Sequence, residues 1–163
     1  MAWASPSRSA ISRSSLVEAT LFLRPILSFV PVAAARIRAL WEGVGMRVDE
    51  MDAARHDQVL AWVSHLPHAL AFSAVNAVLD VDAAMPQFAG PSFGDLTRVA
   101  ASSTDMWCDI FLANAAQVDQ AVARVLTTLE ALRGAIASGD EAAVRALLER
   151  ARAAQRDWSA ARP

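Results

Sequence analysis

The segment from His56 to His68 reads His-Asp-Gln-Val-Leu-Ala-Trp-Val-Ser-His-Leu-Pro-His and holds all three histidines of the 163-residue chain. It lies within a helix predicted over Ala53–Leu79. Pro67 falls inside that helix, where a proline removes one backbone hydrogen bond and clashes with the carbonyl one turn back. We therefore predict a kink near Ser64–Leu66, which would change the direction of the side chains around it.

Further helices are predicted on both sides of this segment, because apolar residues recur there at helical spacing. A loop over Asp80–Ser92 separates the first part of the chain from the later helices, since it contains two prolines and a glycine. The predicted helices are Ala33–Val44, Phe93–Ala101, 106–137 and Glu141–Trp158.

Residues that favour helix N-termini precede three of the predicted helices, including Ala53–Leu79. The candidate N-caps are Asp52, then Thr104 or Asp105, and finally Asp140. Gly139 is expected to end the helix before Asp140.

The helix predicted over 106–137 carries a long apolar stripe, and so long an apolar face needs a helix partner to cover it. The apolar stripe consists of Val118, Val122, Val125, Leu126, Leu129, Leu132 and Ile136.

These patterns predict an all-α fold, a helical bundle with long antiparallel helices, one of them kinked at its proline. Pro25–Val30 is predicted to be a short strand, and Met46–Val48 a short extended segment. We expect two parts: a short irregular or strand-like segment over residues 1–31, and a helical domain over residues 32–163.

The composition limits the possible class of protein. It is 55% hydrophobic and 20% charged, which indicates a folded domain. A net charge of −2 gives no reason to expect a nucleic-acid partner, and no apolar run reaches the length of a membrane span. The apolar run over residues 20–35 is superficially like a signal peptide, but Arg24 and Pro25 interrupt it.

Cys108 is the single cysteine, so an internal disulfide is impossible and a reducing compartment is expected. We therefore expect a cytoplasmic protein in which Cys108 is a small buried apolar side chain.

Three histidines raise the question of a metal site. On a straight helix His56 and His65 lie about 180° apart, whereas His65 and His68 share one face. No Cys, Asp or Glu stands at a helical ligand spacing beside His65 or His68. We therefore expect no metal, and the alternative reading is that one or two of these histidines are hydrogen-bonded core residues.

Asp95 and Arg98 are three residues apart in a predicted helix, so they can form an ion pair. The pair is either a surface contact of little energetic value or an arginine aimed at an anion, since guanidinium suits bidentate recognition of carboxylates. Trp107, nine residues on, either lines an aromatic ligand or fills the core.

Taken in order, these motifs resemble the C-terminal helical domain of prephenate and arogenate dehydrogenases. The resemblance covers about residues 32–137. Each motif is modest by itself, but the ordered set is specific. It comprises His56-Asp57, Ser64-His65-Leu66-Pro67-His68, Asp95-Leu96-Thr97-Arg98, Met106-Trp107, Asp109-Ile110 and Asn114.

The resemblance implies an enzyme that oxidatively decarboxylates prephenate with NAD(P)+ in tyrosine biosynthesis. It implies a homodimer built by the helical domain, and a separate dinucleotide-binding domain that supplies a catalytic histidine. By the same resemblance Arg98 would hold a carboxylate of prephenate and Asp95 would orient or gate that arginine. His68 would face the substrate, while His65 and Trp107 would line or support the pocket.

The chain also departs from the family pattern. No G-x-G-x-x-G fingerprint occurs, only 31 residues precede the helical part, and no histidine precedes His56. We therefore expect residues 1–31 to be a degenerate, poorly ordered remnant of the junction with a missing domain, and the chain to be inactive alone. Two alternatives stay open: a non-catalytic module for dimerisation or aromatic-ligand sensing, and one half of a split dehydrogenase with a separate NAD-binding chain.

Overall fold

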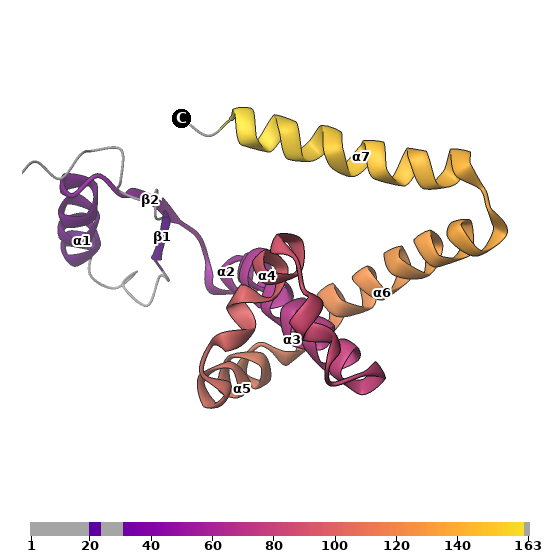
Figure 1. Ribbon diagram of the computed structural model, residues 1–163. Coiled ribbons are helices and arrows are strands. Elements are labelled where there is room, and N and C mark those ends of the chain that lie inside the picture. The colour runs from indigo at the N-terminus through magenta and orange to yellow at the C-terminus, as the bar shows by residue number, and fades with distance from the viewer. Residues whose placement is uncertain (1–19, 24–30, 162–163) are drawn as a thin grey trace, which may run out of the picture. The chain divides into compact units, whose positions relative to one another are not determined.

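The computed structural model describes residues 20–23 and 31–161 (Figure 1). The chain forms two compact units, which follow one another in sequence with the boundary between Val59 and Leu60. The strand predicted over Pro25–Val30 lies outside the described residues, as does most of the segment 1–31, so the predicted domain boundary at residue 31 stays a prediction.

The first unit contains two short strands joined by a helix. Strand β1 (Thr20–Leu23) pairs in parallel with β2 (Arg47–Glu50), in a register that places Thr20 opposite Arg47 and Leu23 opposite Glu50. Parallel neighbours need a crossover connection, and helix α1 (Pro31–Gly43) lies between the strands in sequence. β2 confirms the extended segment predicted near Met46–Val48, whereas the parallel pairing was not predicted.

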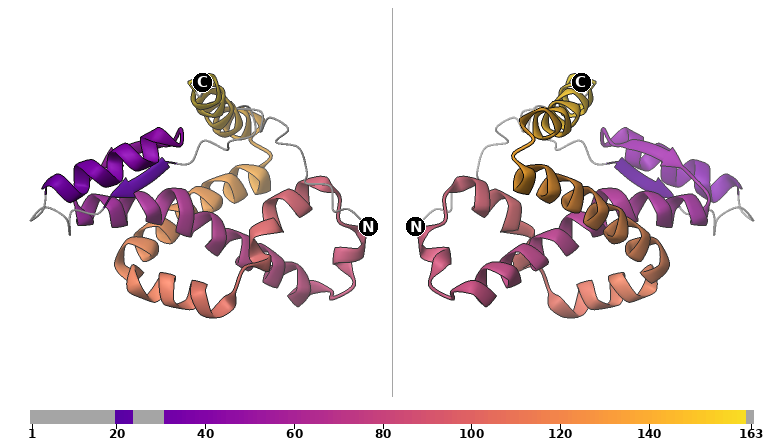
Figure 2. Two further views of the ribbon diagram at one scale, coloured as in Figure 1. Left: turned by 90° about the vertical axis from the view of Figure 1, so that its left-hand side faces the viewer. Right: turned by 90° about the vertical axis from the view of Figure 1, so that its right-hand side faces the viewer.

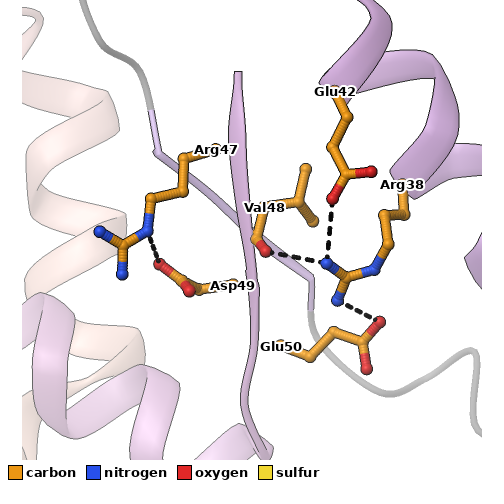
Figure 3. A network of polar contacts seen from close by, with 6 residues as sticks. All are labelled: Arg38, Glu42, Arg47, Val48, Asp49 and Glu50. Carbon is orange, nitrogen blue, oxygen red and sulfur yellow. Dashed lines mark hydrogen bonds and ion pairs between the residues drawn. The ribbon is translucent and has the colours of Figure 1, made fainter. Parts of the chain in front are cut away.

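An arginine in α1 ties this helix to β2 (Figure 3). The guanidinium of Arg38 donates to Glu42 Oε1 at 3.2 Å, to Glu50 Oε1 at 2.8 Å and to the carbonyl oxygen of Val48 at 3.1 Å. The hydrogen bonds to Glu50 and Glu42 raise the pKa of Arg38 above its ordinary value. One cation therefore satisfies a backbone acceptor of the strand and two carboxylates at once.

The rest of the described chain is helical, which confirms the predicted fold class (Figure 1). None of these helices is long and apolar enough to cross a membrane. The elements are α2 (Ala53–Leu60), η3 (Ala61–His65), α3 (Leu66–Val81), η4 (Met85–Phe88), α4 (Pro91–Thr97), η5 (Arg98–Ala101), α5 (Thr104–Ala113), α6 (Ala115–Ser138) and α7 (Glu141–Ala160).

The irregularity expected at Pro67 takes the form of a π-helical turn. η3 is π-helical and ends directly before α3, and the amide of Leu66 donates to the carbonyl of Ala61, five residues back. Pro67 has no amide hydrogen and its ring crowds the carbonyl four residues before it, so a wider turn relieves the clash. π-helical turns of this kind occur frequently at functional sites.

The ends of the later helices differ in part from the prediction. Asp52 and Asp140 cap α2 and α7 as expected, because their carboxylates accept the amides of Arg55 and Ala143. The α5 cap is Ser103, whose hydroxyl accepts the amide of Met106 at 3.4 Å, and not Thr104 or Asp105.

The helix predicted over 106–137 is in fact two helices, because the chain leaves helical geometry at Asn114, with φ −119° and ψ 30°. Gly139, with φ +67°, ends α6 as predicted, and its left-handed backbone suits glycine.

Small residues dominate the interior of the second unit, where α6 crosses the η3–α3 segment (Figure 2). Ala61, Ala71 and Ala121 are completely buried. In the described part of the chain no large side chain is fully buried, and much of the apolar stripe on α6 is exposed. The close approach of the helices thus depends on alanine, and little apolar volume is buried within one chain.

Replacing Ala121 by leucine should therefore lower the free energy of unfolding by about 1–3 kcal/mol, because three extra carbons must enter a tightly packed crossing. Ala123→Leu is the matched control, since Ala123 is exposed on the same helix. Urea unfolding followed by circular dichroism measures both variants. Equal midpoints for the two would contradict the role of Ala121 in close helix packing.

Candidate functional site

A buried tryptophan forms the centre of an aromatic cluster in the second unit. Trp107, on α5, is only 6% exposed. Its ring stacks on His68 with a centroid distance of 3.6 Å and an angle of 21°, and meets His65 edge-on at 6.0 Å and 79°. Phe111, one turn further along α5, packs against it at 5.3 Å. Three residues that were predicted as site residues are thus brought together.

The π-helical turn positions the two histidines of this cluster. His65 is the last residue of η3 and His68 lies in the first turn of α3, so the wider turn lies directly before both side chains. His68 Nδ1 lies 3.0 Å from the carbonyl oxygen of Ser64. A carbonyl can only accept, so Nδ1 of His68 carries the proton.

His65 is the one buried polar side chain among the described residues, at 8% exposure. Its Nδ1 lies 3.3 Å from the side-chain amide nitrogen of Asn114, at the junction between α5 and α6. Asn114 belongs to the motif set, but no role for it was predicted. The only signal available in the sequence was an asparagine between two apolar helical runs.

The indole nitrogen of Trp107 is a buried donor. Nε1 is shielded from solvent and finds no hydrogen-bond partner in the described part of the chain. Leaving such a donor unpaired costs about 1–3 kcal/mol. An acceptor that reaches this position from a ligand or from another chain would remove that cost.

Asp95 lies in α4 and Arg98 begins η5, and both elements pack on α3, the helix that carries His68. Both side chains are exposed, and no ion pair between them is recorded. The expected Asp95–Arg98 contact is therefore not formed within the described structure, which leaves the guanidinium available to an anion.

His56 belongs to the first unit. Its Nδ1 lies 2.9 Å from Asp57 Oδ1, and its side chain is 16% exposed. Within residues 20–23 and 31–161, no three or more His, Cys, Asp or Glu side chains are grouped to hold a metal ion. The three histidines thus have separate local partners.

Cys108 follows Trp107 but is exposed, so the prediction of a buried cysteine is wrong for this structure. Successive residues of an α-helix point in directions about 100° apart. The apolar face of α5, which carries Trp107, is directed toward the core. Cys108 therefore lies on a different side of the helix.

A dinucleotide cofactor does not fit the residues described. In a dinucleotide-binding unit the turn from the first strand to the helix is rich in glycine, which lets the backbone approach the pyrophosphate. Here the chain contains no glycine before Gly43, at the end of α1. The sequence from Thr20 to Glu42 therefore lacks the glycines that a phosphate-binding turn of that kind requires.

The helical architecture and its aromatic cluster define a helical domain of the kind that forms the C-terminal part of certain dehydrogenases. The family model described as "Prephenate dehydrogenase, dimerization domain" matches residues 52–150. The chain thus belongs to the prephenate dehydrogenase family through this domain.

Curated relatives agree with this assignment. A cyclohexadienyl dehydrogenase of Zymomonas mobilis is 39% identical over 112 residues, which are 66% of this chain and 38% of that protein. A prephenate dehydrogenase of Bacillus subtilis is 36% identical over 85 residues, 50% of this chain and 23% of the relative. The chain spans less than two-fifths of the length of these relatives.

Solved structures are similar as well. The prephenate dehydrogenase of A. aeolicus, in complex with hydroxyphenyl propionate and NAD+, superposes with a TM-score of 0.77 and 30% identity, over 85% of this chain and 49% of that one. Synechocystis arogenate dehydrogenase gives a TM-score of 0.74 at 22% identity, over 87% and 53%, which shows a shared fold.

The packing of Trp107 predicts a graded response to substitution. Trp107→Ala should lower the free energy of unfolding by about 3–5 kcal/mol, because it leaves a cavity beside His68. Trp107→Phe keeps a stacked ring and removes the unpaired donor, so it should cost less than about 2 kcal/mol. Urea unfolding measures both, and an alanine variant as stable as the parent would show that Trp107 is not a packing residue.

Proposed function

We propose that this chain binds prephenate, or the closely related arogenate, as the substrate-binding and dimerisation part of a prephenate dehydrogenase that serves tyrosine biosynthesis. The observation that carries the proposal is the His68–Trp107 stack with a buried, unpaired indole N–H. Stacked aromatic rings combined with an unpaired donor suit the recognition of an unsaturated ring that carries carboxylates.

Charge favours the same class of ligand. Prephenate carries two carboxylates, and a guanidinium can hold a carboxylate through two parallel hydrogen bonds. Arg98 is exposed and uncommitted, and it lies in a segment that packs on the helix of His68. We assign Arg98 as the carboxylate clamp, and we propose that Asp95, which forms no ion pair with Arg98 in the described structure, orients or gates it when the ligand binds. His65, His68 and Trp107 line or support the pocket.

The oxidation step lies outside what these residues can perform. NAD(P)+ would supply the hydride acceptor, and the described residues offer no cradle for its phosphates. We propose that a dinucleotide-binding domain, in a longer form of this protein or in a separate chain, completes the enzyme. The residues of this chain then bind and orient the substrate and exclude water from it.

A homodimer is the assembly we propose. On α6 the exposed fractions are 56% for Leu126, 50% for Leu129 and 62% for Ile136. So many exposed large apolar side chains on one helix are typical of an interface. The alanine-dominated interior points the same way, because a second chain would supply the apolar burial that one chain lacks.

Arg98→Ala should weaken prephenate binding by about a hundredfold or more, the effect of losing two charge-assisted hydrogen bonds. The melting temperature should stay nearly unchanged, because the side chain is exposed. Isothermal titration calorimetry with prephenate and a thermal melt give the two readouts.

Arg133→Ala is the control for this experiment, since it removes the same charge from a side chain that is 79% exposed on α6. It should bind prephenate as the parent does. A large loss of stability in Arg98→Ala with binding intact would make Arg98 a structural residue and overturn its assignment as the clamp.

In solution the chain should have twice its 17.4 kDa mass by light scattering. Leu129→Asp places a charge in the apolar stripe and should shift the protein toward monomer, since an unpaired charge is costly to bury. Gln120→Asp, at an exposed polar position of the same helix, should stay dimeric. A parent protein that is monomeric at all concentrations would refute the dimer.

A further inference from the structure

The side chain of Asn114 does not perform the task that its position suggests. Asn114 directly precedes α6, where an asparagine side chain usually accepts an amide of the first helical turn. No such bond forms. The backbone carbonyl of Asn114 accepts the amides of Gln117 and Val118, at 3.2 and 3.0 Å, as the carbonyl of an N-cap residue ordinarily does. The side chain of Asn114 therefore does not cap α6.

The side-chain amide of Asn114 contacts His65, which lies 49 positions earlier in the sequence. Its Nδ2 lies 3.3 Å from Nδ1 of His65, which is buried beside Trp107. An amide NH2 group carries two donors and no acceptor, so Nδ1 must offer its lone pair in this contact. A neutral imidazole with Nδ1 unprotonated carries its proton on Nε2.

We propose that Asn114 is a positioning residue that holds His65 in the Nε2–H tautomer. In this form Nε2 of His65 carries the proton, and the lone pair on Nδ1 is occupied by the asparagine. His65 is then a residue that binds an acceptor and is not a general base. The functional meaning of this donor rests on the proposed binding of an anionic substrate.

In His68 the other ring nitrogen, Nδ1, carries the proton. Nδ1 of His68 donates to the carbonyl of Ser64, so in the neutral ring its Nε2 carries the lone pair. The two imidazoles that contact Trp107 are therefore in different tautomers, each fixed by a different local partner. The unpaired indole N–H of Trp107 matches a ligand rich in acceptors.

The full chain, labelled with 15N-histidine, allows a direct test by long-range 1H–15N NMR at neutral pH. Only three histidines contribute signals, and His56→Gln and His68→Gln variants assign them. The parent protein should show His65 with an unprotonated Nδ1 and a protonated Nε2, and His68 with the reverse pattern. A parent spectrum in which Nδ1 of His65 carries the proton would overturn the proposal without any further variant.

Asn114→Asp sharpens the test, because the new carboxylate has nearly the same size and caps helices equally well but can only accept. The proton of His65 should move to Nδ1, or the ring should become doubly protonated, while His68 is unchanged. Asn76→Asp is the control, since it makes the same change at an exposed position on α3. An unchanged His65 pattern in Asn114→Asp would overturn the proposal.

Calorimetry with prephenate separates this proposal from the proposed function. If the donor of His65 serves the substrate, Asn114→Asp should bind prephenate about tenfold or more weakly than Asn76→Asp. A tautomer change together with no prephenate binding by the parent would support the role of Asn114 and refute prephenate as the ligand. Equal affinities for the two variants would overturn the contribution of His65 to binding.

Discussion

The clash between the ring of Pro67 and the helical backbone before it is the constraint on which the site depends. The helix accommodates it with the π-helical turn of η3, whose last residue is His65. An ordinary helix over the same residues would keep its side chains in a regular 100° sequence. The wider turn ends directly before Leu66, so it lies immediately ahead of the face that carries both histidines. His65 and His68, three residues apart, share that face and contact the same indole, one edge-on and one stacked.

The second general constraint is the small size of the residues at the helix crossing. Alanines let α6 approach the segment that carries the histidines, and this closeness brings Asn114 within reach of His65. The same choice leaves little apolar volume inside one chain, while large apolar side chains remain exposed on α6. The contact of Asn114 with His65 and the exposure of the apolar stripe therefore have one physical origin, namely the use of small side chains where helices cross.

The helical fold and the cluster of His65, His68 and Trp107 could be predicted, because helical periodicity and ordered motifs are local properties of a sequence. The π-helical turn was expected only as a kink, since proline shows where a helix is disturbed but not how. The division at Asn114 was missed because apolar spacing continues through it. The pairing of β1 with β2 and the contact of Asn114 with His65 depend on distant residues, and no local pattern reports those. The predicted Asp95–Arg98 contact is not formed, because helical spacing permits a pair without requiring one.

The interruption at Asn114 separates the orientation of α6 from that of α5. In one uninterrupted helix, Trp107 and Val118 would lie within roughly 20° of the same face, at 3.6 residues per turn. Beginning a new helix at Ala115 resets that rotational phase. The direction of Trp107 on α5 is therefore set separately from that of the apolar stripe on α6, while Asn114, at the junction, still links the start of α6 to His65. A change in the later turns of α6 can alter the stripe without turning the indole.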